Sequence, residues 1–182
     1  LSFSASINND KVGALFFSDR IEEFIPPKKG RSHLLHIIRE IIELKPASDG
    51  TDIGQALRFL TNALKKKCTA FVLSDFYDRK SFEKEVQMAG RKHDLMAIQV
   101  YDRRAQMLPD VALMKIRDAE TGHEMLIDTS SKKLRQAHAK YFADWQAQLR
   151  ETFNKSSVDW TSIATDADYV KAMMMLFNRR AK

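Results

Sequence analysis

Four short apolar runs, separated by stretches with helical spacing, constrain the fold of this chain more than any other feature. The runs are Val12–Phe17, Thr69–Ser74, Leu95–Val100 and Val158–Ile163. A short run that is apolar throughout is typical of a strand buried on both faces, as the strands of a parallel sheet are. Strands that alternate with helices form parallel βαβ units. We therefore predict an α/β fold, in which a doubly wound, mostly parallel sheet contains all four runs and has helices on both faces.

Between and after these runs, apolar residues recur every three or four positions, which predicts amphipathic helices. The predicted helices cover roughly residues 31–44, 51–64, 80–91 and 129–153 and a last segment from residue 166 onward. Thr51 or Asp52 can supply the N-cap oxygen of the second helix. Thr129 or Ser130 can cap the long fourth helix.

Two hairpins complete the predicted fold. Arg20–Ile25 is expected to pair with the first apolar run and to be ended by Pro26 and Pro27. Val111–Arg117 and His123–Ile127 flank the sequence Glu120-Thr121-Gly122. We predict that they form a hairpin added to the α/β domain.

The composition is that of one soluble domain. Residues 1–182 fit a single domain, and no apolar run approaches the roughly 20 residues that cross a bilayer. The single cysteine, Cys68, excludes an intrachain disulfide, so we predict a cytoplasmic protein. The first residue is Leu1, and residues 1–7 do not resemble a signal peptide but resemble the end of a helix. We therefore expect the chain to be a partial domain that lacks its first strand.

The net charge of +6 comes from short basic clusters, such as Lys65–Lys67. Such clusters can bind nucleic acid, but here no aromatic residues are interleaved with them, so we do not expect a nucleic-acid partner. Motifs of phosphate-binding loops, dinucleotide folds, serine hydrolases and zinc proteases are absent from the sequence. His33 and His36 could share a helix face, but the pair lacks the third ligand that a zinc site requires.

Polar residues at the ends of the predicted strands indicate a binding site. Asp75 follows the run Thr69–Ser74, and Thr51 opens the helix before that strand. Ligands of open α/β sheets bind at the carboxyl ends of the strands, so both side chains could reach one crevice. A hydroxyl and a carboxylate, with waters between them, suit Mg²⁺. Each residue can equally be a helix cap.

Several segments resemble the bacterial domain-of-unknown-function-58 family, a branch of the von Willebrand factor A superfamily. These segments are Asn9-Asp10-Lys11-Val12-Gly13, Phe17-Ser18-Asp19, Gly50-Thr51-Asp52-Ile53-Gly54, Ser74-Asp75-Phe76, Val100-Tyr101-Asp102, Leu108-Pro109-Asp110, Asp118-Ala119-Glu120-Thr121-Gly122 and Asp166-Ala167-Asp168-Tyr169-Val170. The likeness spans nearly the whole chain. It implies a von Willebrand factor A-like fold, related in architecture to Rossmann-like sheets.

The resemblance also implies a metal-ion-dependent adhesion site made of an Asp-x-Ser-x-Ser segment, a Thr and an Asp. Thr51 and Asp75 match the Thr and the Asp, whereas the first segment is not in this sequence. We therefore expect Mg²⁺ to bind the intact parent and to bind this chain weakly or not at all. Asp52, Phe76 and Asp78 are the predicted partner-binding residues near the site. Strand edges left unpaired by the missing strand could allow self-association.

By this resemblance, the predicted function is that of a protein-interaction module rather than an enzyme. Members of the family are commonly associated with MoxR-type AAA ATPases and are thought to help assemble or activate complexes. The alternatives are a metal-dependent hydrolase or phosphoryl-transfer enzyme in the same crevice, with Asp75 holding the ion and Asp52 or Asp78 as base, and nucleic-acid binding through the basic clusters.

Overall fold

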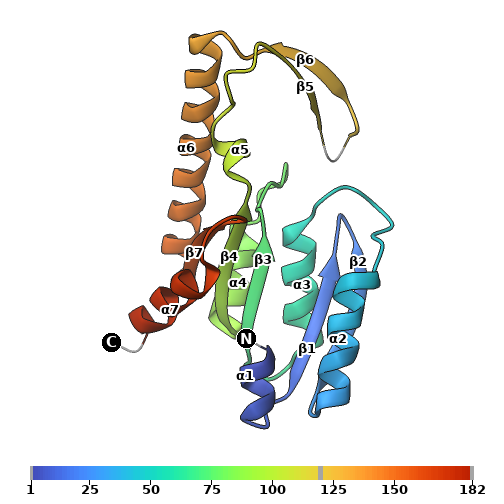
Figure 1. The fold of residues 1–182 in the computed structure, drawn as a ribbon. Helices are drawn as coiled ribbons and strands as arrows, with labels where there is room; N and C mark the ends of the chain where they lie inside the picture. Colours follow the sequence, from blue (N-terminus) through green and yellow to red (C-terminus); the bar gives the residue numbers. More distant parts are fainter. Residues whose placement is uncertain (1, 119–120, 181–182) are drawn as a thin grey trace.

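The computed structural model describes residues 2–118 and 121–180, and its helices and strands alternate along most of the chain (Figure 1). The elements are α1 (Ser2–Ile7), β1 (Val12–Phe17), β2 (Ile21–Lys28), α2 (Arg31–Glu43), α3 (Ile53–Ala63), β3 (Thr69–Ser74), α4 (Glu83–Lys92), β4 (Asp94–Tyr101), α5 (Arg103–Gln106), β5 (Leu113–Arg117), β6 (Glu124–Asp128), α6 (Lys132–Lys155), β7 (Asp159–Ala164) and α7 (Tyr169–Arg180). The predicted α/β class is confirmed. Leu1 of the predicted N-terminal helix end and Glu120 of the predicted hairpin turn lie outside the described residues.

A parallel sheet of three strands, in the order β3-β4-β7, forms the centre of the structure. Thr69 of β3 lies beside Asp94 of β4, and Met96 of β4 lies beside Asp159 of β7. Met96, Ala97 and Ile98 in the central strand are each at most 2% exposed, because the strand is paired on both edges and covered on both faces. The apolar runs thus predicted these three strands correctly.

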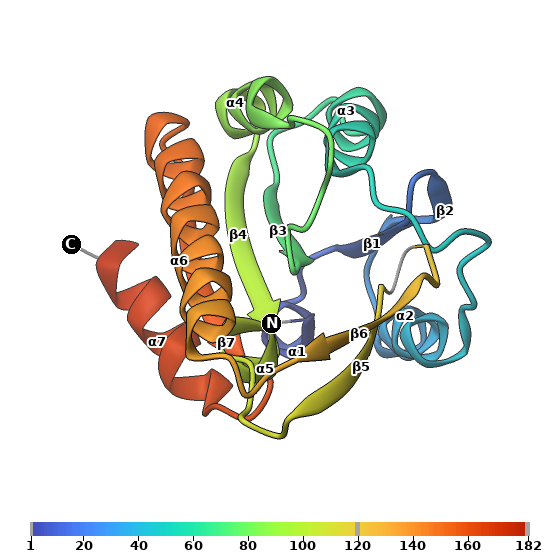
Figure 2. The same cartoon turned by 90° about the horizontal axis from the view of Figure 1, so that it is seen from above.

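The run Val12–Phe17 also forms a strand, but its predicted membership of the parallel sheet is wrong. Among the described residues β1 pairs only with β2, in antiparallel orientation. The run is apolar because helices pack against the β1–β2 hairpin from two sides, α2 from one and α3 from the other (Figures 1 and 2). An unbroken apolar run therefore indicated burial on both faces and gave no information about which strand would pair with it.

The two prolines do not end β2, which continues through them to Lys28 and pairs with Val12 there. Proline is tolerated in edge strands and at bulges, and the register of this pair shifts between Val12 and Ala14, opposite the two prolines. Gly13 of β1 makes this close pairing possible. A Cβ atom at position 13 would lie 2.8 Å from the Ile25 carbonyl oxygen and 2.9 Å from the Pro27 nitrogen.

The main core lies between the parallel sheet and the layer formed by α3, α4 and α6. Its members from this layer and its loops include Ile53, Leu57, Phe76, Phe82, Val86, Leu149 and Phe153. The Phe153 ring lies 5.1 Å from that of Phe76 and 5.9 Å from that of Trp160 on β7. On the other face of the sheet, α7 contacts β7, and Phe177 contacts Phe71 of β3. The helices thus lie on both faces, as predicted (Figure 2).

The β5–β6 hairpin extends beyond the end of the central sheet, near the start of α6 (Figure 1). Thr129 closes its base, since its hydroxyl donates to the Ala112 carbonyl oxygen at 2.8 Å and its N–H donates to the same oxygen at 2.7 Å. The predicted capping of α6 by Thr129 or Ser130 is therefore wrong. Ser131 is the N-cap, and its hydroxyl accepts from Leu134 N–H.

Phe153 provides a test of where the core lies. Its side chain is 1% exposed, so Phe153→Ala should lower the free energy of unfolding by about 3–5 kcal/mol through lost burial and a residual cavity. Phe177→Ala is the matched control, because that ring is 39% exposed, and its loss should be clearly smaller. Urea denaturation followed by circular dichroism measures both. Equal losses would contradict the placement of the core.

Candidate functional site

Three loops meet where β1 and β3 end and α3 begins. The N–H of Asp52 donates to the carbonyl oxygen of Ser18, which follows β1, at 2.9 Å. The N–H of Ile53 donates to Oδ2 of Asp78, in the loop after β3, at 2.8 Å. These two bonds join the loops after β1 and β3 to the start of α3. The loops that carry Thr51 and Asp75 thus lie at one edge of the structure.

Asp52 is the N-cap of α3, which settles the choice between Thr51 and Asp52. Its Oδ1 accepts from Gln55 N–H at 2.7 Å, and its Oδ2 accepts from the Lys80 ammonium at 2.7 Å. Partial burial raises the pKa of Asp52, but the hydrogen bonds from Lys80 and Gln55 outweigh it and hold the pKa below its usual range. The hydrogen bond to Asp52 in turn raises the pKa of Lys80. Asp52 is therefore a charged, paired carboxylate.

Asp78 is a second cap for the same helix rather than for the following one. Besides accepting from Ile53, it accepts from Lys80 N–H through Oδ1 at 2.8 Å. Thr51, immediately before Asp52, is half-buried, and its hydroxyl has no hydrogen-bond partner among the described residues. Its oxygen is thus left available for another ligand.

Asp75 is exposed at the end of β3, where its Oδ1 accepts from Tyr77 N–H at 3.0 Å. Within the described part of the chain, no hydrogen bond joins it to Thr51. A hydroxyl and a carboxylate are donors that Mg²⁺ accepts, and both lie in loops at this edge. Because the ion takes six oxygens, two protein donors leave most of its coordination to water or to further residues.

The assignment of Phe76 to a partner-binding surface is wrong. Its side chain is 2% exposed and packs against Phe82 and Phe153. Its φ of 62° lies in the left-handed region, which is rare for a bulky residue. The Ser74 hydroxyl accepts from Phe76 N–H at 2.9 Å and helps to hold this turn. The turn places Phe76 in the core while Asp75 and Tyr77, on either side of it, remain accessible.

A buried glutamine, which sequence reasoning missed, is hydrogen-bonded to the Asp75 loop from inside the sheet. Gln99 of β4 is 0% exposed, and its Oε1 accepts from the Ser162 hydroxyl at 2.7 Å and from Gln146 at 3.4 Å. Its Nε2 donates to the Asp75 carbonyl oxygen at 3.5 Å. A polar residue inside the apolar run Leu95–Val100 was the available signal, because a buried amide requires partners.

A partly exposed aromatic surface lies beside Asp75. We define it as Tyr77, Tyr141 and Trp145, where the Tyr77 and Trp145 rings lie 5.0 Å apart. Burial and a hydrogen bond with Tyr141 raise the pKa of Tyr77 to about 12, so the Tyr77 phenol stays protonated at neutral pH. Tyr77 is 47% exposed and Tyr141 is 59% exposed. Tyr141 is thus open to solvent, although the next residue of α6, Phe142, is buried.

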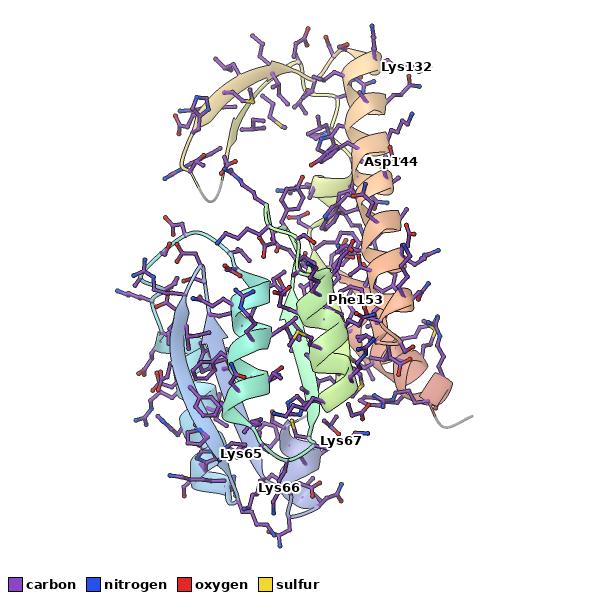
Figure 3. All side chains as sticks on the ribbon, turned by 180° about the vertical axis from the view of Figure 1, so that it is seen from behind. Lys65, Lys66, Lys67, Lys132, Asp144 and Phe153 are labelled. Atoms are coloured by element: carbon purple, nitrogen blue, oxygen red, sulfur yellow. The ribbon has the colours of Figure 1, made fainter. Side chains whose placement is uncertain are left out.

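The tip of the β5–β6 hairpin reaches the same loop. Arg79 lies 3.6 Å from the Asp118 carboxylate at the end of β5. The hairpin, the loop after β3 and the aromatic surface therefore lie in one region of the molecule. The basic cluster Lys65–Lys67 lies at the opposite end from Lys132 at the start of α6 (Figure 3).

Comparison with known proteins agrees with the resemblance seen in the sequence. Residues 1–148 match the model of a family described as "Protein of unknown function DUF58". The chain belongs to the DUF58 family. An uncharacterized protein of Mycobacterium tuberculosis (strain ATCC 25618 / H37Rv) is 27% identical over 174 residues, which cover 93% of this chain and 54% of that protein. An uncharacterized protein of Mycobacterium avium is 26% identical over 162 residues, which cover 87% and 94%.

The DUF58 chain thus spans about half the length of the first of these relatives. Two solved structures share its fold. One is a conserved hypothetical protein BatB from Bacteroides thetaiotaomicron, with a TM-score of 0.56 and 16% identity; the match covers 95% of this chain and 80% of that one. The other is an aerotolerance-related membrane protein from Bacteroides fragilis, with a TM-score of 0.57 and 14% identity; the match covers 94% of this chain and 80% of that one. Across the described residues, no helix of this DUF58 chain is both long and apolar enough to cross a membrane.

The N-terminus of α3 gives a pH-dependent prediction. Asp52→Ala should lower the free energy of unfolding by about 1 kcal/mol at pH 7, whereas Asp52→Asn should retain most of the capping. Because the pKa of Asp52 is lowered in the folded state, the stability from its charge is present above about pH 5 and is lost as the pH falls below about 4. Asp52→Asn should therefore flatten this part of the stability curve.

The measurement is urea denaturation between pH 3 and pH 7. Asp49→Ala, which removes an exposed carboxylate three residues earlier, is the control and should behave like the wild type. Thr51→Ala should cost little, since Thr51 is not the cap. A Thr51→Ala loss as large as that of Asp52→Ala would contradict the assignment.

Proposed function

We propose that this DUF58 domain is a metal-assisted protein-interaction module, in which Thr51 and Asp75 bind Mg²⁺ and the adjoining aromatic surface contacts the partner. The observation that supports this most directly is the position of Asp75. Its exposed carboxylate lies beside Tyr77, whose ring contacts Trp145 and whose hydroxyl is hydrogen-bonded to Tyr141. A charged group next to accessible tyrosine and tryptophan rings is typical of the centre of a protein interface.

The proposed metal site is incomplete within this sequence. Thr51 and Asp75 would supply two oxygens, and the family resemblance implies further ones from an Asp-x-Ser-x-Ser segment. When bound, the ion would accept an acidic side chain of the partner as a ligand. Asp52 and Asp78 would not bind the ion themselves. They would position Thr51, because both are hydrogen-bonded to the start of α3.

The state of these carboxylates favours binding over catalysis. A general base needs an available lone pair and a pKa near the working pH. Asp52 has a lowered pKa and is bonded to Gln55 and Lys80, and Asp78 is bonded to Ile53 and Lys80. Neither matches the base that a hydrolase or phosphoryl-transfer enzyme in this crevice would require.

The proposed partner is a MoxR-type AAA ATPase in the cytoplasm, where the module would help to assemble or activate a complex. The resemblance to the family suggests this class of partner. Nucleic-acid binding through the basic clusters is less favoured, because two of them, Arg103-Arg104 and Arg179-Arg180, each contain an arginine that is already paired. Arg103 forms an ion pair with Asp166, and Arg180 pairs with Asp94 and Asp159.

The metal is tested in a longer form of the protein that includes an Asp-x-Ser-x-Ser segment. Mg²⁺ should raise its melting temperature, because an ion that binds only the folded state stabilises it by mass action. Asp75→Ala and Thr51→Asn should abolish the shift, whereas Thr51→Ser, which keeps the hydroxyl, should retain it. Asp10→Ala is the control, since this exposed carboxylate precedes β1 at the opposite edge. Differential scanning calorimetry with Mg²⁺ or EDTA measures the shift.

The same variants give the partner test, with a purified MoxR-type ATPase as the probe in calorimetric titrations. Mg²⁺-dependent affinity that is lost in Thr51→Asn and kept in Thr51→Ser is the expected result. Equal affinities of the two variants would leave Thr51 without a metal role. Metal-dependent turnover of a phosphate ester would instead favour the enzyme.

The aromatic surface is tested separately from the metal. Tyr141→Ala should weaken the complex roughly tenfold or more, as loss of a central interface tyrosine does. Tyr169→Ala is the matched control, because Tyr169 is 67% exposed on α7 rather than on α6. Both variants should fold like the wild type by circular dichroism. Equal affinities of Tyr141→Ala and the wild type would exclude this surface from the interface.

A further inference from the structure

The β1–β2 hairpin brings a carboxylate under helix α2. Side chains alternate between the two faces of a strand, and Phe24 of β2 points to α3, where its ring lies 5.3 Å from that of Phe59. Glu23 and Ile25 consequently face the other side, which α2 covers. Ile25 is 4% exposed there, and Glu23 is half-buried.

Helix α2 presents two further ligand groups to this position. His36 and Glu40 are four residues apart and therefore lie on the same face of the helix. The Nδ1 atom of His36 and an Oε1 atom of Glu40 are 3.6 Å apart. One ligand atom from each of Glu23, His36 and Glu40 lies within 4.8 Å of the others, and the described part of the chain holds no second such group of three.

We infer that Glu23, His36 and Glu40 form a binding site for a divalent transition-metal ion such as Zn²⁺. Zinc binds histidine nitrogen and carboxylate oxygen at about 2.0–2.2 Å, so two of its tetrahedral ligands lie about 3.4 Å apart. The separation of His36 and Glu40 already matches this spacing. A change of side-chain rotamer would bring the Glu23 carboxylate to the position of the third ligand.

The charges of the group point to a cation. Two carboxylates that approach one another are destabilised unless positive charge lies between them. The Glu23 carboxylate forms no hydrogen bond or ion pair with any described residue, and the Glu40 carboxylate pairs with the His36 imidazole. A metal ion would neutralise both carboxylates at once. The imidazole favours a transition metal, because an all-oxygen set is the one that suits Mg²⁺.

The exposure of the group suits an exchangeable ion. The His36 side chain is 50% exposed and that of Glu40 is 23% exposed, so an ion can enter from solvent and keep a water as its fourth ligand. Bound metal would cross-link β2 to α2. The site lies apart from Thr51 and Asp75 in its residues and its donor chemistry, and it does not depend on the proposed function.

The test uses Co²⁺ as a spectroscopic probe and Zn²⁺ in calorimetric titrations of the whole chain. The wild type should show visible absorption of Co²⁺ in a nitrogen and oxygen environment and should bind one Zn²⁺. His36→Ala and Glu23→Gln should each weaken Zn²⁺ binding by roughly tenfold or more, since even residues that only support a ligand contribute 10- to 100-fold. Zn²⁺ should raise the melting temperature of the wild type more than that of either variant.

Two controls separate this site from other sources of metal binding. His123→Ala removes an exposed histidine of the β5–β6 hairpin and should leave Zn²⁺ affinity unchanged. Asp75→Ala should also leave it unchanged, so that failure of the Mg²⁺ site and failure of this one are distinguishable. The inference is overturned if the wild type binds no Co²⁺ or Zn²⁺, or if His36→Ala binds as tightly as the wild type.

Discussion

The N-terminus of α3 is the point on which the arrangement of the candidate site depends. The first N–H groups of a helix have no partner within it, and their loss of water must be compensated. Here Gln55 N–H is satisfied by Asp52 and Ile53 N–H by Asp78, which is 25 residues further along the chain. Asp52 also bonds through its N–H to the end of β1. One helix end thereby fixes three loops that the sequence keeps apart.

This structural role of Asp52 and Asp78 determines what the remaining polar groups can do. Both carboxylates accept hydrogen bonds from the start of α3 and from Lys80, so they hold this helix end in place. The Thr51 hydroxyl, by contrast, has no hydrogen-bond partner among the described residues, and the Asp75 side chain is exposed. Gln99 supports this division from inside the sheet, because its buried amide bonds to the backbone of Asp75. The accessible residues are thus held by buried ones.

The sequence predicted the local elements well because local periodicity and turn residues determine them. The runs Val12–Phe17 and Thr69–Ser74 are strands with the predicted bounds. The edge at which Thr51 and Asp75 lie was also predictable, because parallel strands bring their carboxyl ends together. The spacing of apolar residues indicates which segments are helices or strands and which faces are buried, and the fold class follows from this.

What only the tertiary structure decided are the pairings between distant residues. The pattern in Val12–Phe17 is the same whether helices or strands surround it, so it could not show that β1, among the described residues, pairs with β2 and not with the parallel sheet. Phe76 and Tyr77 are adjacent aromatic residues in one loop, yet a left-handed turn buries the first and exposes the second. Glu23 and His36 belong to different elements and meet only because α2 packs on one face of the hairpin. Sequence determined the elements because neighbouring residues specify them, whereas contacts across the fold depend on the packing of whole elements against one another.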